Sequence, residues 1–416
     1  MSKLFNRLIL VILVLFIMNI SVEAESPFKV VQLTDNIYQL STDEGAYTTN
    51  SLVYVGSEGV LLVDANAAEY ADEFKKIIDS YEKGFPKYII NTHRHVEHIG
   101  GNAVFGDSPT VISHYLLPSK LKSGSYIFDE FPKSTYPNIV VIDSLILNFN
   151  DEKIRIIEMG GSHDDNEIMI HFTKSKIVHL SSICNGLNFP SIDADGDLNK
   201  FPELIQKAID MLPKDVTIVS GHNNNCSWKD LHAYREMLIN TKAIVQKGID
   251  EGKDVKTMQE EKVFNDYELY NQSYVSTDEW IEYNYDVITN KDEKKKQIYK
   301  PLYYALQDGG VEKAIQKYNE LKSKSNTAYN ISEIPLLVIG DKLQGKGKND
   351  LALGILEFCL KEYPEGKYAY YVHYIMSTAH KDLGDKKNAL KHCNKSMELK
   401  EEFQAAKKLL EEINNM

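Results

Sequence analysis

Residues 92–101 read Thr-His-Arg-His-Val-Glu-His-Ile-Gly-Gly, and they follow the apolar, strand-like run 87–91. Three histidines and a carboxylate fall within six consecutive positions of this stretch. Imidazole is the commonest protein ligand for a metal ion, and a catalytic zinc site needs three protein ligands and an open position. In a tight turn the first two histidines can reach one point while Glu97 and the third histidine reach another nearby. The stretch therefore predicts a metal centre at the end of a strand.

The same arrangement recurs along the chain, where strand-like runs end in loops with potential ligands. Short apolar or alternating runs typical of strands occur between residues 28 and 64 and again between 139 and 180. Segments with helical spacing lie between or after them, at 67–81, 198–212 and 227–251. The candidates that follow four of the strand-like runs are, in chain order, the histidine loop, His163, Ser182 with Cys184, and His222. This recurrence predicts that the loops converge on one site.

The order and spacing of these candidates resemble the metallo-β-lactamase superfamily over roughly residues 28–250. Members of that family carry an H-x-H-x-D-H motif, a later glycine–histidine loop, a strand-end aspartate and a final Gly-His. The resemblance implies an α/β fold, the four-layer αβ/βα sandwich called the metallo-β-lactamase fold, with the site at one edge. It implies metal ligands at His93, His95, Glu97, His98, His163 and His222. It also makes Glu97 and His222 catalytic candidates.

By that resemblance, His93, His95 and His163 hold the first metal ion. Three neutral histidines and a water molecule complete a catalytic zinc shell. Zinc would lower the pKa of its bound water to about 7 and so supply a hydroxide nucleophile. Asp64, which closes the strand-like run 60–63, matches a family aspartate that supports the histidine loop through hydrogen bonds.

The second metal position departs from the family at two residues. Glu97 replaces an aspartate, and its carboxylate lies one carbon–carbon bond further out, roughly 1.5 Å. If the strand-like run 176–180 continues without a gap, Ser182, or alternatively Ser181, takes the place of an aspartate that bridges the two metals in the family. Zinc prefers cysteine, histidine and carboxylate ligands to a neutral hydroxyl. We therefore expect one zinc ion and a weak or empty second site.

Cys184 offers a different second site. It lies two residues beyond Ser182, on the same face of the chain if the strand continues. It could then bind a metal ion together with Glu97 and His222. A buried thiol, or a disulfide bond with Cys226, is the alternative. The four cysteines, at positions 184, 226, 359 and 393, allow three connectivities, and the sequence does not choose among them.

Residues 1–24 have the pattern of a secretory signal peptide, with Lys3 and Arg7 before the apolar run 8–20 and a small residue at the end. The apolar run is shorter than the ~20 residues of a membrane span. We therefore expect cleavage after residue 24, no membrane attachment afterwards, and a periplasmic or secreted protein. The formal charge of the full chain is −13. So negative a chain disfavours nucleic acid and anionic membranes as partners.

The chain is expected to form two regions after the signal peptide. Residues 25–290 would form the metallo-β-lactamase-like domain with a helical extension. Residues 291–416 would form a helical region that resembles tetratricopeptide repeats, because Ala314, Ala352 and Ala389 recur in similar segments at intervals of 38 and 37 residues. A charged segment at 290–296 marks the boundary. The helical region is expected to pack or to contact a protein partner rather than to take part in the chemistry.

These observations favour an exported zinc-dependent hydrolase that acts on an ester, amide, lactam or sulfate-ester bond of a small molecule. Metal-activated water would attack the electrophilic centre, and the metal or a nearby donor would stabilise the oxyanion. The alternative is a catalytically impaired member of the same fold that serves as a binding protein, with the helical region as its contact surface. An iron-dependent oxygenase ranks last, because such members usually carry an aspartate at the serine position.

Overall fold

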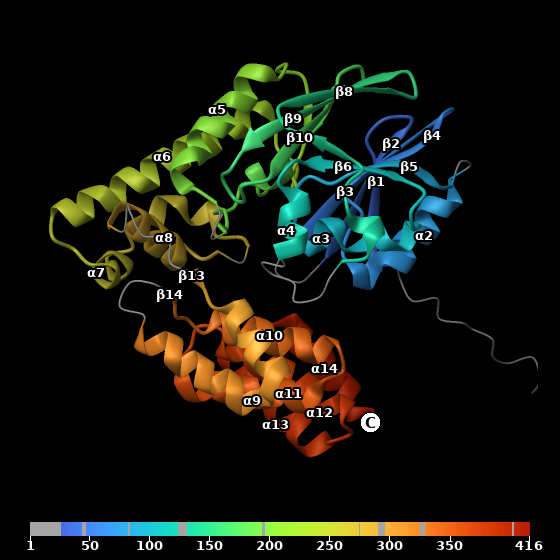
Figure 1. The fold of residues 1–416 in the computed structure, drawn as a ribbon. Helices are drawn as coiled ribbons and strands as arrows, with labels where there is room; N and C mark the ends of the chain where they lie inside the picture. The colour runs from blue at the N-terminus through green and yellow to red at the C-terminus, as the bar shows by residue number, and fades with distance from the viewer. Residues whose placement is uncertain are drawn as a thin grey trace, which may run out of the picture.

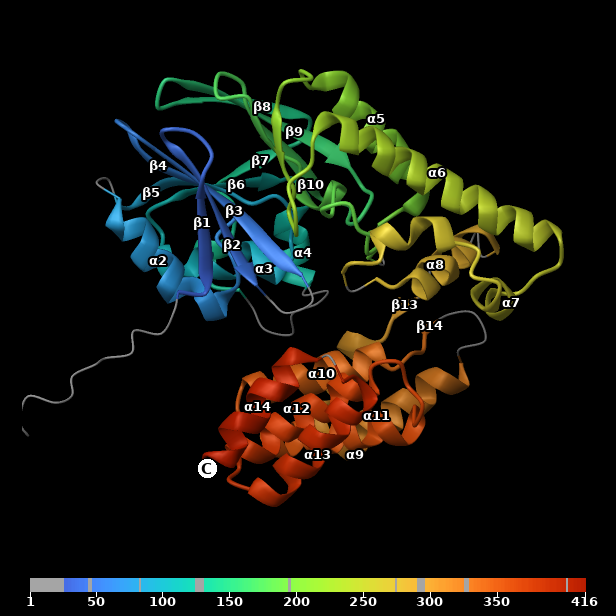
Figure 2. The same ribbon diagram turned by 180° about the vertical axis from the view of Figure 1, so that it is seen from behind.

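The computed structural model describes residues 26–43, 47–81, 84–123, 131–193, 196–273, 275–289, 296–324, 329–401 and 403–416. The expected signal peptide 1–24 and the boundary at 290/291 lie outside these residues. Two stacked sheets with helices on their outer faces form the N-terminal part, and a separate group of helices forms the C-terminal part (Figures 1 and 2). α8 (Thr277–Thr289) lies between the two parts.

The first sheet contains seven strands in sequential order. They are β1 (Phe28–Gln32), β2 (Ile37–Asp43), β3 (Thr48–Gly56), β4 (Gly59–Val63), β5 (Pro86–Ile90), β6 (Thr110–His114) and β7 (Ile139–Val141). The first four pair antiparallel, and β4 to β7 pair parallel through helical connections. The carboxyl ends of β4 and β5 are therefore neighbours, which places Asp64 beside the histidine loop.

The second sheet contains five strands in the order β12-β11-β10-β9-β8. Its strands are β8 (Ser144–Phe149), β9 (Glu152–Gly160), β10 (Glu167–Phe172), β11 (Ile177–His179) and β12 (Thr217–Val219). Only β11 and β12 pair parallel. The loop between β9 and β10 carries His163, and the loop after β12 carries His222.

Alternate side chains of the central strands fill different cores. Leu61 and Val63 of β4 pack between the two sheets, whereas Val60 and Leu62 pack under the outer helices. A strand that is buried on both faces reads as a continuous apolar run, as this one does. The helices over the first sheet are η1 (Ala68–Tyr70), α2 (Ala71–Ser80), α3 (Val96–Ile99), η2 (Gly100–Phe105) and α4 (Leu117–Ser123), with η3 (Lys133–Thr135) close by.

The outer helices of the second sheet are α5 (Phe201–Met211), which follows η5 (Leu198–Lys200), and α6 (Trp228–Asp250). Pro202 lies in the first turn of α5, where its missing N–H group costs nothing. Ser227 and Asp230 form a reciprocal capping box at the start of α6. The predicted four-layer αβ/βα sandwich is therefore confirmed.

The elements that follow α6 in the chain are helical apart from one short strand pair. They are α7 (Val255–Glu260), η6 (Asn265–Tyr270), α8, β13 (Lys296–Gln297), α9 (Tyr299–Ser323), β14 (Tyr329–Asn330), α10 (Ile334–Gly345), α11 (Asn349–Glu362), α12 (Ala369–Asp382), α13 (Lys386–Leu399) and α14 (Gln404–Asn414). α10 packs on α11, and α12 packs on α13. The predicted all-helical C-terminal region is therefore confirmed.

The regularly spaced alanines lie in the interior of this region. Ala314, Ala352 and Ala389 are all buried. Helices stacked in pairs need small residues where they approach closely. The specific likeness to tetratricopeptide repeats stays a prediction. Within the described residues, no helix combines the length and the apolar character that crossing a membrane requires.

Candidate metal centre

The histidine loop starts directly after β5 and leads into the short helix α3. His95 is the N-cap of α3, and Glu97 and His98 are within its single turn. His163 comes from the β9–β10 loop of the other sheet, and His222 comes from the loop after β12. One loop of the first sheet and two loops of the second sheet thus meet at one place, as the recurrence of strand-end ligands predicts.

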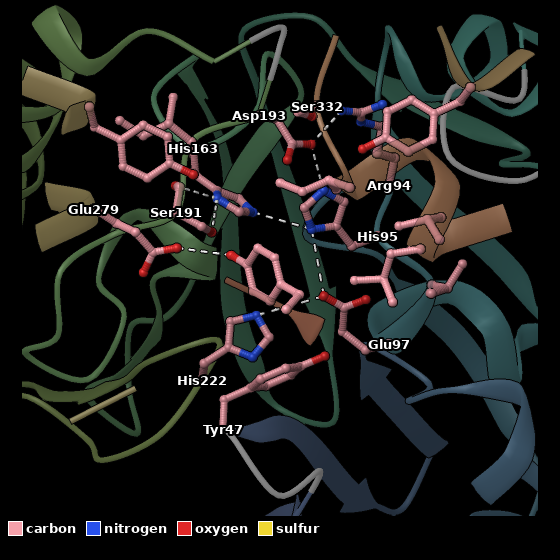
Figure 3. A pocket seen from close by; sticks show the side chains of 18 of the residues that line it. Tyr47, Arg94, His95, Glu97, His163, Ser191, Asp193, His222, Glu279 and Ser332 are labelled. Carbon is pink, nitrogen blue, oxygen red and sulfur yellow. Dashed lines mark hydrogen bonds and ion pairs between the residues drawn. The ribbon is translucent and has the colours of Figure 1, made fainter. Parts of the chain in front are cut away.

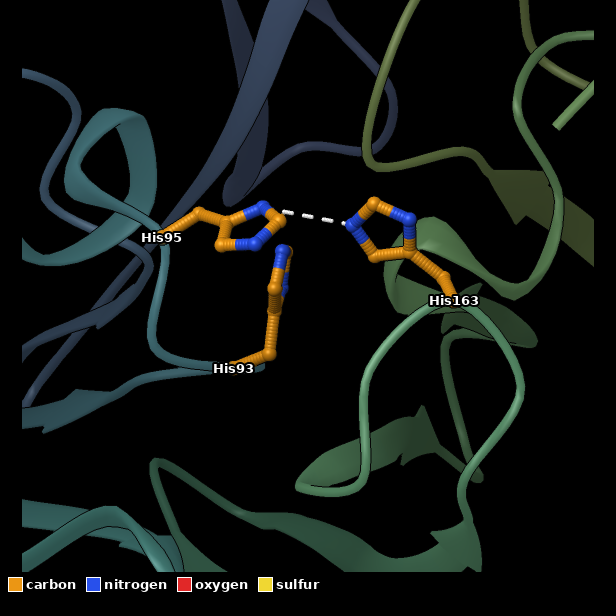
Figure 4. Close-up of side chains that lie close together, drawn as sticks. All are labelled: His93, His95 and His163. Carbon is orange, nitrogen blue, oxygen red and sulfur yellow. Dashed lines mark hydrogen bonds between the residues drawn. The ribbon is translucent and has the colours of Figure 1, made fainter. Parts of the chain in front are cut away.

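The first group of donors consists of His93, His95 and His163, which offer ligand atoms all within 4.8 Å of one another. Their rings face a common point (Figure 4). His163 Nε2 lies 3.2 Å from His95 Nδ1. His93 Nε2 is buried and has no hydrogen-bond partner among the described residues. A buried imidazole nitrogen without a partner is costly unless something binds it, so this group fits a zinc ion.

The outer ring nitrogens of these histidines are held by the protein. His95 Nε2–H donates to Asp193 at 2.7 Å, and His163 Nδ1–H donates to the carbonyl oxygen of Ser191 at 2.8 Å. His93 Nδ1 lies 3.1 Å from the hydroxyl oxygen of Thr92. Such contacts fix the tautomer and turn the free lone pair of each ring towards the metal position.

The second group of donors consists of Glu97, His98 and His222, again with ligand atoms within 4.8 Å of one another. His98 Nε2 lies 3.2 Å from His222 Nε2, and Glu97 Oε1 lies 4.0 Å from the same His222 atom. From the sequence, the longer side chain of Glu97 is expected to weaken this position. In the structure Glu97 Oε1 lies 3.5 Å from His95 Nδ1 and 4.0 Å from His222 Nε2. Its carboxylate therefore lies beside both donor groups, and three donors are available to a second metal ion.

Asp64 supports both the loop and the second group, as the resemblance implies. Its Oδ1 accepts the backbone N–H of Thr92 at 2.8 Å, and its Oδ2 accepts the Thr92 hydroxyl at 2.8 Å and His98 Nδ1–H at 2.7 Å. The outer nitrogen of His222 donates to the carbonyl oxygen of Thr48 at 3.2 Å. Each imidazole of the second group is therefore oriented by an acceptor behind it.

The backbone after β11 differs from the continuous strand that the sequence predicts. On the assumption that the strand continues, the sequence predicts Ser182, or alternatively Ser181, at the metal-bridging position. Instead β11 ends at His179, and Ser181 adopts a left-handed backbone conformation with φ 52°. The Ser181 hydroxyl lies 3.4 Å from His93 Nδ1, whereas the Ser182 hydroxyl is buried with no partner among the described residues. The expected alternation of side chains between the two faces of a strand fails, because the 3-10 helix η4 (Ser181–Ile183) replaces the strand here.

The assumption of a continuous strand also predicts the wrong position for Cys184. It was considered as a ligand with Glu97 and His222, but its Sγ lies 2.7 Å from Cys226 Sγ in the apolar core under α5 and α6. Neither thiol belongs to a metal-ligand group within the described residues. The interpretation of Cys184 as a metal ligand is therefore wrong.

Sequence reasoning missed two charged residues of the site, Arg94 and Asp193. The Arg94 guanidinium pairs with the buried carboxylate of Asp164 and with Asp193, which in turn accepts from His95. Arg94 lies in the sequence between two candidate ligand histidines, and this position is the one feature from which its place in the site could have been predicted. Asp193 lies 98 residues from His95, in a segment without a recognisable pattern.

Burial favours the neutral, metal-binding form of three of the four histidines, and His95 is the exception. Burial, followed by repulsion from neighbouring imidazoles, holds the pKa of His93 and His222 well below the ordinary value, and burial lowers the pKa of His163 to about 4. Burial acts in the same direction on His95, but the carboxylates of Asp193 and Glu97 outweigh it and raise its pKa. Metal binding needs neutral imidazole and displaces such a proton.

A pocket of about 870 Å³ opens over the ligands. Its floor includes His95, Glu97, His163 and His222 (Figure 3). Its walls come from α8 and also from the helical region, although the sequence predicts that the helical region takes no part in the chemistry. The wall residues from these parts are Glu279, Glu282, Tyr283, Asp286, Tyr299, Ser332, Glu333, Ile334, Leu337, Val338, Lys367 and Tyr368.

Three solved structures are similar to about half of this chain. A solved metallo-beta-lactamase from Pontibacter korlensis is 20% identical over 51% of this chain and 99% of its own, with a TM-score of 0.46. VMB-1 is 18% identical over 52% of this chain and 99% of its own, with a TM-score of 0.44. The DIM-1 metallo-beta-lactamase is 15% identical over 51% of this chain and 97% of its own, with a TM-score of 0.44.

No curated protein matches the sequence significantly. The family profile described as "Metallo-beta-lactamase superfamily" matches residues 45–174, which include the histidine loop and His163. Residues 45–174 of this chain therefore match a metallo-beta-lactamase superfamily domain, and an all-helical region follows further along the chain.

Proposed function

We propose that this protein is an exported metallo-hydrolase with two adjacent zinc sites. The observation that carries the proposal is the pair of three-donor groups, His93/His95/His163 and Glu97/His98/His222, whose ligand atoms cluster side by side. Export rests on the signal-peptide pattern of residues 1–24.

Zinc, when bound, supplies Lewis acidity and an activated water molecule for hydrolysis at neutral pH. The protein residues hold the geometry. Asp193, the Ser191 carbonyl and Asp64 orient His95, His163 and His98 through their outer nitrogens. The catalytic roles of Glu97 and His222 are to fix the second ion and, at the pocket floor, to face the substrate.

The pocket supports a small-molecule substrate rather than a macromolecule. A volume of about 870 Å³ is in the range of sites that enclose drug-sized ligands, roughly 300–1,000 Å³. An ester, amide, lactam or sulfate ester of that size is the proposed class. Apolar side chains on one face of α10, at Ile334, Leu337 and Val338, form part of the wall, so the helical region would contact substrate. We also propose that the outer surface of the helical region binds a protein partner.

The test is metal analysis of purified residues 25–416 together with turnover of chromogenic ester, lactam and sulfate-ester substrates. About two zinc ions per chain and turnover of one class are expected. His163→Ala should lose zinc and activity, because it removes a donor of the first group. His232→Ala, on α6 and outside both groups, is the matched control. A chain that retains no zinc would contradict the proposal.

The second candidate is a binding protein of the same fold without turnover. The observation in its favour is that two serines with neutral hydroxyls, Ser181 and Ser182, follow β11, where the resemblance implies a bridging carboxylate. The same experiment separates the two functions. Full zinc occupancy without turnover of any class in the panel would favour the binding protein.

A further inference from the structure

The two sulfur atoms of Cys184 and Cys226 lie in contact inside the largest apolar core of the domain. The distance between the two sulfur atoms is 2.7 Å, both side chains are buried, and the two residues are 42 positions apart in the sequence. The core around them contains Phe189, Leu231 and Tyr234. No other described cysteine is near. Cys359 and Cys393 lie in separate clusters of the helical region.

The backbone around the pair is already fixed by long-range hydrogen bonds. Cys226 pairs with Ile218 in an isolated bridge, and its N–H donates to the Ile218 carbonyl at 3.0 Å. The Ser220 hydroxyl donates to the carbonyl oxygen of Cys184 and accepts the Gly186 N–H at 2.9 Å. The thiols are therefore held together by their loops and need no movement of the chain to meet.

We propose that Cys184 and Cys226 form a disulfide bond in the mature protein. The bond joins two functional loops. One loop carries Ser181, whose hydroxyl contacts His93, and the other carries His222 of the second metal group. The Gly221 N–H already donates to the Ser181 carbonyl at 2.7 Å between the same loops, so the covalent link would fix an existing contact.

The oxidant is a protein or small-molecule disulfide. One cysteine thiolate attacks a sulfur of that disulfide, forms a mixed disulfide and releases one thiolate of the oxidant. The second cysteine thiolate then attacks the mixed disulfide and releases the other. Two S–H bonds and the oxidant's S–S bond are lost, and one protein S–S bond and two oxidant thiols are gained. Because both side chains are buried in the folded chain, this exchange takes place before the core closes.

The test uses the full chain, refolded from denaturant in a mixture of reduced and oxidised glutathione. Free thiols are then alkylated in denaturant without reductant, and the intact mass is measured. Two alkylated cysteines are expected, Cys359 and Cys393, together with a proteolytic fragment that joins residues 184 and 226. Four alkylated thiols, or a link through Cys359 or Cys393, would overturn the proposal.

A second measurement does not depend on any substitution. Oxidised and reduced wild-type chains are compared by thermal unfolding with a chelator present, so metal binding and turnover play no part in the result. The oxidised form should unfold about 10 °C higher, since closing a loop of this length restricts the unfolded chain. Equal midpoints would show that the link does not fix the loops. Cys359→Ala, the control, should keep the link between residues 184 and 226.

Discussion

The hydroxyl group of Tyr368 donates a hydrogen bond of 2.9 Å to a carboxylate oxygen of Glu279. Tyr368 is the N-cap of α12, and Glu279 lies in the first turn of α8. Lys367 forms an ion pair with the same carboxylate of Glu279. The other oxygen of this carboxylate accepts hydrogen bonds from the backbone N–H and the hydroxyl of Ser276. This cluster connects the helical region to the domain extension at the wall of the metal pocket.

Tyr368→Phe removes the hydroxyl from this connection and keeps the ring. A hydrogen bond to a charged group contributes roughly 1.5–3 kcal/mol, so the variant should be about 2 kcal/mol less stable. Thermal or urea unfolding measures the change. Tyr304→Phe is the matched control, because Tyr304 is 58% exposed on α9. Equal stability of the two variants would show that this hydrogen bond contributes nothing to the free energy of unfolding.

Glu97→Asp tests the length of the carboxylate in the second metal group. The structure places the longer Glu97 side chain within reach of His98 and His222, and aspartate would withdraw its oxygens by roughly 1.5 Å. We expect the zinc content after dialysis to fall from about two ions to about one. Glu236→Asp, on the exposed face of α6, should leave it unchanged. A rise in occupancy would instead support the expectation drawn from the family motif.

Asp64→Asn tests the orientation of His98 by the residue behind it. Asp64 has a positive φ of 60°, a conformation that asparagine also tolerates. The substitution thus keeps the backbone and removes the charge that accepts from His98. Loss of such a supporting contact typically weakens metal binding about 10–100-fold. Competition with a chromogenic chelator measures the change, and Asp197→Asn at the start of η5 is the control. Unchanged affinity would exclude an orienting role for the Asp64 charge.

Glu167 predicts a pH dependence of stability. Burial raises its pKa to about 8, although the Ser162 hydroxyl donates to it at 2.8 Å. The folded protein therefore holds a proton that the unfolded chain releases near its ordinary pKa, about 4.5. Stability from this group is complete below that value and is lost as pH rises towards about 8.

Glu167→Gln, a neutral side chain of the same shape, should remove this loss. The free energy of unfolding of the wild type should fall by a few kcal/mol between pH 5 and 8 relative to the variant. Urea unfolding at several pH values measures it. Parallel pH profiles for wild type and variant would show that Glu167 is ionised in the folded protein.

Gly101→Ala tests why a glycine follows the histidine loop. A Cβ atom there would overlap the carbonyl oxygen of Ala65, and the Gly101 N–H donates to the Asn66 carbonyl at 2.8 Å. The two backbones cannot separate without disturbing Asp64 and the loop, so a loss of about 3 kcal/mol is expected. Gly345→Ala, at the end of α10 with open space around it, should be neutral or slightly stabilising. A tolerated Gly101→Ala would show that the close approach can relax.

The sandwich fold and most of the candidate metal ligands could be predicted from the amino-acid sequence alone. Strand and helix periods are local properties, and ligands that follow strand ends in a known order need no tertiary information to be recognised. His93, His95, His163 and His222 were identified on that basis, and Asp64 by its place at the end of β4.

Which other side chains face the site could not be predicted from the sequence and is known from the folded structure. Ser181 adopts a left-handed backbone conformation, so the chain does not continue as the predicted strand. Cys184 therefore lies in the core beside Cys226. Asp193 meets His95 across 98 positions of sequence, and the helical region reaches the pocket through Tyr368. Contacts between distant segments depend on how whole layers pack, and no local pattern encodes them.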